Sequence, residues 1–280
     1  MMTPTGAAGV RDALFDGAAE LNLPLSPSLL SLLRCEDSLP CGQGRCPICA
    51  SKLTMLLHSI KQAPDLRRQR WQKSAFALRS FSYASTELAA IPIDKINSGV
   101  AAILDGYVRS FLRQDNRGSM KYGCIAQIGL VEDTSPASAC EKVVVVEFAL
   151  TGGNEETDYD MFESLHAHFG KELYHVAGND LGPQEVEPVP LLSAEASRFL
   201  PEQGLLFGYT KRRLDTPERP TVISSKKRLA RMAFNYGNHT LRSRILSRGL
   251  SNNGTELVFD EDARGDLWEI DYFSQLDLQP

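Results

Sequence analysis

The stretch from Val143 to Leu150, VVVVEFAL, constrains the fold of this 280-residue chain more than any other segment. Four consecutive valines and the Glu-Phe-Ala-Leu that follows them make a short, β-branched and almost wholly apolar run. A Gly pair at positions 152 and 153 closes it. Such a run predicts a strand that is buried on both faces. The fold must therefore supply neighbours that cover both sides of this strand.

The elements around this strand follow an informative order. The patterns predict a strand at 75–83, a helix along 96–111, strands at 122–131 and 143–150, a helix at 159–169, and a last strand in either 173–178 or 185–192. This order is the split β-α-β arrangement of ferredoxin-like folds, in which helices cover one face of an antiparallel sheet. The predicted class is α+β with a ferredoxin-like antiparallel core.

Four of the six cysteines lie within fifteen positions, at Cys35, Cys41, Cys46 and Cys49. The Cys-Pro-Ile-Cys turn brings two thiolates together, and glycines at 42 and 44 let the chain fold back so that the other two complete a tetrahedron. This pattern predicts a structural zinc site, a closed zinc knuckle with no open position for substrate. The alternatives are a three-cysteine site completed by His58 and a set of ordinary reduced thiols.

The charge is unevenly distributed. The net charge is -5, yet the block from Lys211 to Arg248 holds eleven Lys and Arg against two acids. A basic block in an acidic chain predicts a polyanion partner, DNA or RNA, because phosphate binding releases condensed counterions. The alternative is a solvated helix face. The predicted contacts are Lys211, Arg212, Arg213, Lys226, Lys227, Arg228, Arg231, Arg242 and Arg244.

The predicted organisation has three parts. Residues 1–73 form a helical preface with the zinc-knuckle module, 74–215 the ferredoxin-like core, and 216–280 a basic helical region with an acidic tail. In the last part we expect two helices, one from Ser224 or Ser225 to Gly237 and a second with Leu241, Ile245 and Leu246. The acidic tail is a candidate surface for a protein partner. Neither a membrane span nor a secretory signal is visible, so we expect a cytoplasmic protein with no membrane contact.

Several pieces together resemble the rolling-circle replication initiators of plasmids and phages, which belong to the HUH endonuclease superfamily of mobile elements. The matching pieces are CGQGRCPIC (41–49), the strand VVVVEFAL, LHAHF (165–169) and GLLFGYTKRR (204–213), within residues 35–215. The resemblance implies DNA replication chemistry, in which a tyrosine nicks single-stranded DNA at a phosphate that a bound metal polarises. By position, His166 and His168 would be ligands of Mg²⁺ or Mn²⁺, with Glu147 as a third ligand and Tyr209 as the nucleophile.

The local pattern around the histidines favours another interpretation. Two residues apart on a strand, His166 and His168 would share a face, but on a helix they would lie about 200° apart and could not grip one metal. The apolar spacing from Tyr159 to Phe169 is helical, and Gly170 is a typical helix end. An inactive relative that keeps the DNA-binding fold is therefore the alternative to a nicking enzyme.

Two further function classes stay open. One is a non-catalytic, zinc-containing nucleic-acid-binding subunit, for example of an RNA-guided defence complex. The other is a regulatory interaction protein whose basic block serves solubility. Metal-dependent nicking of single-stranded DNA would indicate the replication initiator. Tight binding of nucleic acid without cleavage would indicate the binding subunit, and the absence of salt-sensitive binding would indicate the regulatory protein.

Overall fold

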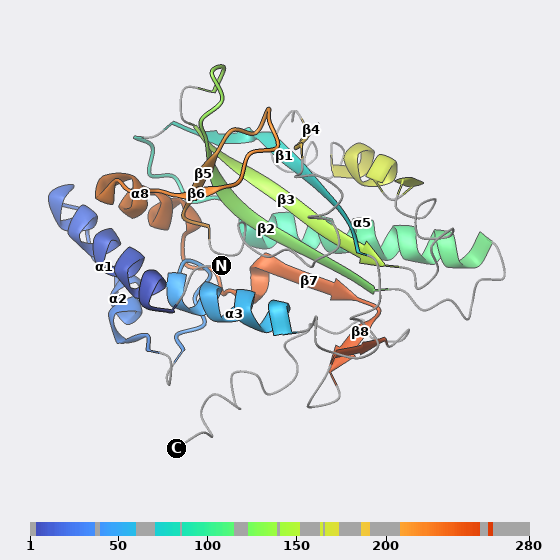
Figure 1. Cartoon of the computed structure of the whole chain (residues 1–280), viewed down its shortest axis with the longest axis horizontal. Helices are drawn as coiled ribbons and strands as arrows, with labels where there is room; N and C mark the ends of the chain where they lie inside the picture. Colours follow the sequence, from blue (N-terminus) through green and yellow to red (C-terminus); the bar gives the residue numbers. More distant parts are fainter. Residues whose placement is uncertain are drawn as a thin grey trace.

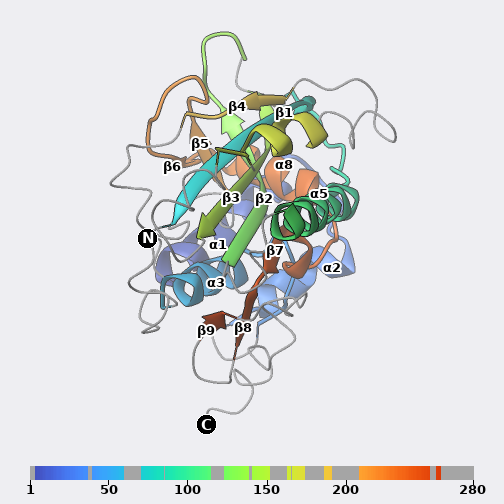
Figure 2. The same cartoon turned by 90° about the vertical axis from the view of Figure 1, so that its right-hand side faces the viewer.

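A mixed sheet with helices packed around it confirms the predicted α+β class (Figures 1 and 2). The computed structural model describes residues 4–36, 40–59, 71–84, 86–114, 123–138, 141–151, 163–164, 166–173, 186–190, 208–252 and 257–259. Its helices are α1 (Pro4–Glu20), α2 (Pro27–Leu30), α3 (Pro47–Ser59), α5 (Ile93–Gln114) and α8 (Lys226–Tyr236), with 3₁₀ turns at Ser31–Arg34 and Arg242–Arg244. Residues 166–173 are also helical.

The strands form one large sheet and one small one. They are β1 (Gln72–Tyr83), β2 (Gly123–Asp133), β3 (Lys142–Thr151), β4 (Val186–Pro188), β5 (Thr210–Arg212), β6 (Thr221–Val222), β7 (Ile245–Arg248), β8 (Leu250–Asn252) and β9 (Leu257–Phe259). The large sheet has the order β4-β1-β3-β2-β5-β6, and β7 also pairs with β2. The predicted valine-rich strand is β3, which pairs antiparallel with β1 on one side and β2 on the other.

The elements occur in the predicted order. After β1 come α5, β2, β3, the helical segment at 166–173 and β4, which lies in the Pro-rich segment predicted at 185–192. Residues 174–178 of the alternative strand lie outside the described residues. The contacts of β1 with β3, β1 with β4 and β2 with β3 are all antiparallel. The central part of this sheet therefore has alternating strand directions, with a short connection only between β2 and β3.

One face of the sheet is apolar and covered by helices. Strand alternation places Phe76 on β1 and Phe148 on β3 on the same face, and both rings lie near Phe169 of the 166–173 helix. The predicted stripe of α5 is buried where its side chains are described, with Val100 0% and Ile103 4% exposed. Burial of these apolar stripes is what holds the helices on the sheet.

The predicted N-terminal helices are present, and α1 packs on α8 (Figure 1). The face with Leu14 and Ala18 is fully buried. Gly17 lies against the backbone of Lys226, where a Cβ atom would collide with the carbonyl group. A glycine at this position therefore allows the N-terminal end of α8 to approach the α1 backbone.

The second helix predicted in the C-terminal region is wrong. The first helix is α8, with Ser225 at its N-cap and Gly237 at its C-cap. Leu241 then leads into a single 3₁₀ turn, and Ile245 and Leu246 belong to β7, which pairs with residues 124–127 of β2. Both side chains are buried, 1% and 5% exposed, so the sheet edge overrides the helical spacing.

The edge of β2 is shared by two short strands and has a gap between them. Strand β5 pairs with residues 131–133 and β7 with 124–127. In the gap, the Tyr236 hydroxyl accepts a hydrogen bond from the Leu130 amide at 2.8 Å, and the Arg244 Nε donates to the Ile128 carbonyl at 3.2 Å. Side chains thus replace the missing strand partner, because buried backbone groups need hydrogen bonds.

Arg244 is fully buried and joins three parts of the fold. Its Nη1 donates to the Gly44 carbonyl at 2.6 Å, its Nη2 to the Tyr236 hydroxyl at 3.3 Å, and its guanidinium lies 4.5 Å from the centre of the Tyr236 ring. Burial lowers the pKa of Arg244, while the nearby tyrosines raise it. A buried cation is tolerated only with such hydrogen bonds.

We predict that Arg244→Gln lowers the free energy of unfolding by about 3 kcal/mol or more, because it leaves the Ile128 and Gly44 carbonyls unpaired. The control is Arg219→Gln, at an exposed position, which should change stability by less than about 0.5 kcal/mol. Urea unfolding followed by circular dichroism measures both. Equal stability of the two variants would contradict the role given to Arg244.

Candidate functional site

The four predicted cysteines converge on one point. Their Sγ atoms all lie within 4.8 Å of one another, with Cys35 to Cys49 at 3.5 Å and Cys41 to Cys49 at 3.8 Å. Four sulfurs on a tetrahedron with metal–sulfur bonds of about 2.3 Å stand about 3.8 Å apart. The donor set therefore fits a metal ion such as zinc. The side chain of His58, the alternative fourth ligand, lies outside the described residues.

The local sequence explains how the cysteine loop forms. Gly42 has φ of 65°, a conformation that a glycine adopts at little cost. Pro47 opens α3, where its missing amide is no loss, so Cys46 and Cys49 lie at the first turn of this helix. The Cys49 amide points to the Cys46 sulfur at 3.5 Å. The positive end of the helix dipole stabilises thiolates there.

Protonation of the cluster is strongly coupled. Hydrogen bonds from the other three thiols lower the pKa of Cys35, whereas the Cys35 contact raises the pKa of both Cys46 and Cys49. Four thiolates this close repel one another unless a cation lies between them. The cysteine set thus offers a closed, four-ligand site, which is typical of structural rather than catalytic metal sites.

The cysteine loop is bound to the core rather than appended to it. The Gly44 amide donates to the His239 carbonyl at 2.9 Å, and the Leu241 amide donates to the Gly42 carbonyl at 2.7 Å. Arg244 adds the bond to Gly44 described above. Hydrogen bonds from residues 239–244 therefore hold the cysteine loop on the core.

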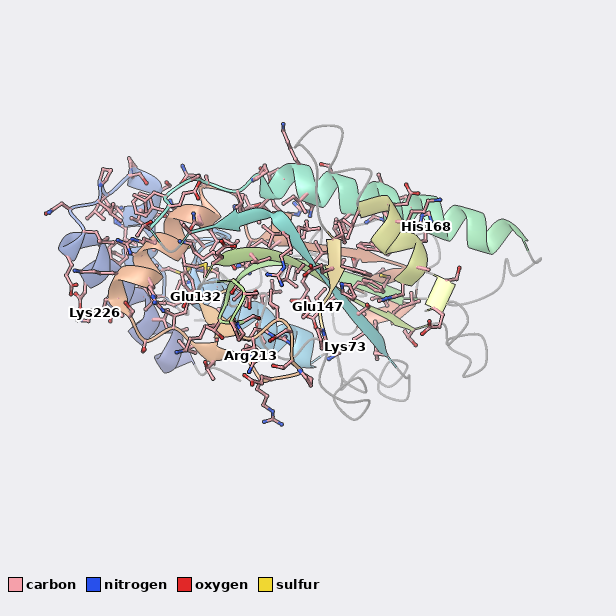
Figure 3. All side chains as sticks on the ribbon, turned by 90° about the horizontal axis from the view of Figure 1, so that it is seen from above. Lys73, Glu132, Glu147, His168, Arg213 and Lys226 are labelled. Atoms are coloured by element: carbon pink, nitrogen blue, oxygen red, sulfur yellow. The ribbon has the colours of Figure 1, made fainter. Side chains whose placement is uncertain are left out.

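The structure places His166 and His168 on a helix, with neither aimed at a shared metal. His166 hydrogen-bonds through Nδ1 to the Ser74 hydroxyl, and its ring lies 4.9 Å from the Phe76 ring. Glu147 pairs with Ala75 in the register and so lies on the opposite face of the sheet from Phe76. Figure 3 shows His168 beside α5, away from Glu147. The three predicted ligands are not brought together.

Tyr209, the predicted nucleophile, lies in the core. It is 0% exposed, its hydroxyl donates to the Arg45 carbonyl at 2.5 Å, and its ring lies 5.9 Å from the Tyr236 ring. Burial raises its pKa well above the usual value of a tyrosine. A buried, protonated hydroxyl with this partner supports the cysteine loop and is not open to a scissile phosphate.

The predicted nucleic-acid contacts fall into distinct environments. Three are paired with acids: Lys226 with Asp16 at 2.7 Å, Lys227 with Glu20 at 3.9 Å and Arg213 with Asp215 at 2.9 Å. Arg212 donates to the Pro190 carbonyl, Arg242 is exposed at the 3₁₀ turn and Arg244 is buried. Arg213 is thus paired with an acid of the block itself, whereas Lys226 and Lys227 meet acids of α1 in space.

Of the remaining three, Lys211 and Arg228 lie beside the buried carboxylate of Glu132. Arg231 lies within electrostatic reach of Lys142, the residue paired with Glu132 across the β2–β3 register. Arg228 Nη1 is 2.8 Å from Glu132 Oε1, and the Glu132 side chain is only 2% exposed. The register places Lys142 of β3 opposite Glu132 on one side and Lys211 of β5 on the other. We call Lys142, Lys211, Arg228 and Arg231 the cationic cluster.

The cationic cluster has more positive charges than nearby carboxylates to balance them. The pKa of Lys142 is lowered to about 8 by burial and by the charges of Arg231 and Arg228, while Glu132 and Glu87 oppose the shift. The Lys142 ammonium also donates to the Glu87 carbonyl oxygen at 3.4 Å. Four cations near two carboxylates, Glu132 and Glu87, leave an excess of positive charge that attracts anions.

Sequence reasoning missed Glu132 and Lys142 as parts of a site. The sequence did contain a signal for this pair, because Glu132 and Lys142 flank a short connection between two consecutive predicted strands. A hairpin across this connection pairs Glu132 with Lys142 and sets both on one face. Their neighbours on β5 and α8 come from distant parts of the chain.

Comparisons with known proteins provide no family assignment. No family model, no curated protein and no solved structure matches this chain. Among the described helices, none is long and apolar enough to cross a membrane.

We predict that Cys49→Ser abolishes tight zinc binding and lowers the midpoint of thermal unfolding. The wild type should hold about one zinc ion per chain, and a chelator should reproduce the loss of stability. Cys124→Ala is the matched control, since Cys124 is buried in β2 and lies outside the cluster. Metal analysis after gel filtration decides the matter; a Cys49→Ser protein that keeps its zinc would refute the four-ligand site.

We predict a pH-dependent loss of stability at His239. Burial, with the charge of Arg244 adding to it, lowers the pKa of His239 from 6.5 to about 4, and its Nε2 is buried without a partner among the described residues. The unfolded chain therefore binds a proton more readily, and stability falls as the pH drops from about 6.5 toward 4. In His239→Asn the unfolding free energy should fall less steeply, by about 1 to 3 kcal/mol over this range. Identical slopes would contradict the assignment.

Proposed function

We propose that this protein binds single-stranded nucleic acid through the cationic cluster, as a non-catalytic, zinc-containing binding protein. The observation that carries the proposal is that Lys142, Lys211 and Arg228 lie beside one buried carboxylate, Glu132. Arg231 adds a fourth cation within electrostatic reach of Lys142. Neutralising phosphates with such a cluster releases counterions and favours binding without a sequence requirement. DNA is the favoured ligand and RNA the alternative. The acidic tail, a predicted site for a protein partner, lies almost wholly outside the described residues.

Binding is better supported than nicking. The rolling-circle mechanism needs a tyrosine hydroxyl and a metal at one phosphate, yet Tyr209 is buried against Arg45, and His166 and Glu147 lie on opposite faces of the sheet. The resemblance to the rolling-circle initiators then extends to the binding fold and not to its chemistry. We accordingly treat Mg²⁺ or Mn²⁺ catalysis as absent from the proposed function.

The sheet supports a ferredoxin-like core. The order β4-β1-β3-β2 with three antiparallel contacts is the one that a split β-α-β unit produces. Strands β5, β6 and β7 extend this unit along the free edge of β2 and bring Lys211 beside Glu132. We assign zinc to the cysteine cluster as a structural ion, and four reduced thiols suit a cytoplasmic location.

The test is the salt dependence of binding to a labelled single-stranded oligonucleotide, measured by fluorescence anisotropy. We predict that Lys211→Gln/Arg231→Gln weakens binding at least tenfold and reduces the slope of log K against log salt by about 0.7 for each lost contact. The control Lys226→Gln/Lys227→Gln removes the same charge from residues that α1 neutralises, and should change affinity less than threefold.

Two outcomes would overturn the proposal. Equal weakening in the two double variants would show a diffuse charge effect, and salt-insensitive or undetectable binding would remove the polyanion partner. A covalent adduct with single-stranded DNA in Mn²⁺, absent in Tyr209→Phe, would instead establish the nicking mechanism.

A further inference from the structure

The face of the sheet remote from α5 carries a second group of polar side chains. Gln127 of β2 stands directly opposite Glu147 of β3, and Lys73 of β1 is a diagonal neighbour of Glu147, since Ala75 and Glu147 are paired. Strand alternation sets all three on the face that does not carry Phe76 and Phe148. Figure 3 shows Lys73 and Glu147 together, well separated from His168 and from Glu132.

Arg212 of β5 reaches over this face. Its Nη2 donates to the Pro190 carbonyl at 2.9 Å. Pro190 follows β4, which is at the opposite end of the strand order from β5 and β6. Burial lowers its pKa, and the charge of Glu147 is the largest opposing influence. Burial raises the pKa of Glu147, against the charges of Lys73 and Arg212. Two cations and one carboxyl group thus lie within electrostatic reach of one another.

Several donors on this face are buried without a hydrogen-bond partner in the described part of the chain. They are Gln127 Nε2, Thr151 Oγ1, Thr210 Oγ1 and Arg212 Nε. The registers and strand alternation place all four residues on the same side as Glu147. Gln127 is only 1% exposed, and an unpaired buried donor costs about 1 to 3 kcal/mol. Gln127 stands in the same row as Glu147, whereas Thr151 and Thr210 lie four residues away along the ladder in opposite directions. The unsatisfied donors of Gln127 and Arg212 indicate a group that would accept from them.

We propose that this face binds a phosphate monoester whose alcohol part carries a free hydroxyl group, with Arg212, Lys73 and Gln127 around the phosphate and Glu147 at the hydroxyl. Nucleoside monophosphates and sugar phosphates share this chemistry. The site lies on the opposite face from the cationic cluster and does not depend on the proposed nucleic-acid binding.

The donor set decides the ligand class. A guanidinium, an ammonium and an amide N–H suit the oxygens of a phosphate, which accepts several charge-assisted hydrogen bonds at once. Glu147 would repel a ligand that is only an anion. A hydroxyl beside the phosphate offsets part of this repulsion because it donates a hydrogen bond to the carboxylate. The ligand must therefore present both groups side by side.

The experiment is isothermal titration calorimetry of the full chain with adenosine monophosphate, ribose 5-phosphate and inorganic phosphate. We expect at least one ester to bind tenfold or more tightly than inorganic phosphate. Arg212→Gln should weaken ester binding at least tenfold. Arg213→Gln is the matched control with the same loss of charge, because Arg213 is an exposed neighbour paired with Asp215.

Glu147→Gln gives a second readout, in which the predicted effect is a gain of phosphate binding rather than a loss. Without the negative charge, inorganic phosphate should bind more tightly, and the preference for the ester should shrink at least threefold. Equal binding in Arg212→Gln and Arg213→Gln, or an unchanged ester preference in Glu147→Gln, would overturn the proposal. Absence of any phosphate or ester binding would overturn it as well, whatever the result with oligonucleotides.

Discussion

The buried guanidinium of Arg244 is the interaction on which the rest of this structure depends. Taking a charge out of water costs several kcal/mol, and here the cost is offset by hydrogen bonds to two carbonyl oxygens and a tyrosine hydroxyl. Those acceptors belong to β2, the cysteine loop and α8. The arginine can be buried only when all three are in place, so its burial makes their assembly cooperative.

The basic residues between Lys211 and Arg248 have different structural roles, of which the burial of Arg244 is one. Arg244 forms hydrogen bonds inside the core, Lys226 and Lys227 are paired with acids of α1, and Lys211 and Arg228 lie beside Glu132. Arg231 lies within electrostatic reach of Lys142. The metal loop is likewise a brace for the free edge of β2, through the Gly44 carbonyl and the Tyr209 hydroxyl. A local charge count cannot separate these roles, because each depends on what the fold places beside the side chain.

The parts predictable from the sequence were those fixed by local pattern. The valine-rich strand, the stripe of α5, the caps of α8 and the converging cysteines follow from periodicity, turn residues and ligand spacing. Strand β7 did not, because Ile245 and Leu246 fit a helix locally and become a strand only when β2 offers an edge. The roles of Arg244 and Lys142 were equally hidden, since burial of a cation depends on acceptors that are distant in the sequence.

The most direct test of this account is hydrogen exchange of backbone amides before and after removal of the metal by a chelator. If the cysteine loop braces the sheet edge through Arg244, the Leu130 amide should lose protection together with the amides of Gly44 and Leu241, which bond within the same assembly. Faster exchange confined to residues 41–50, with Leu130 as protected as before, would contradict it and show that the metal loop folds independently of the sheet.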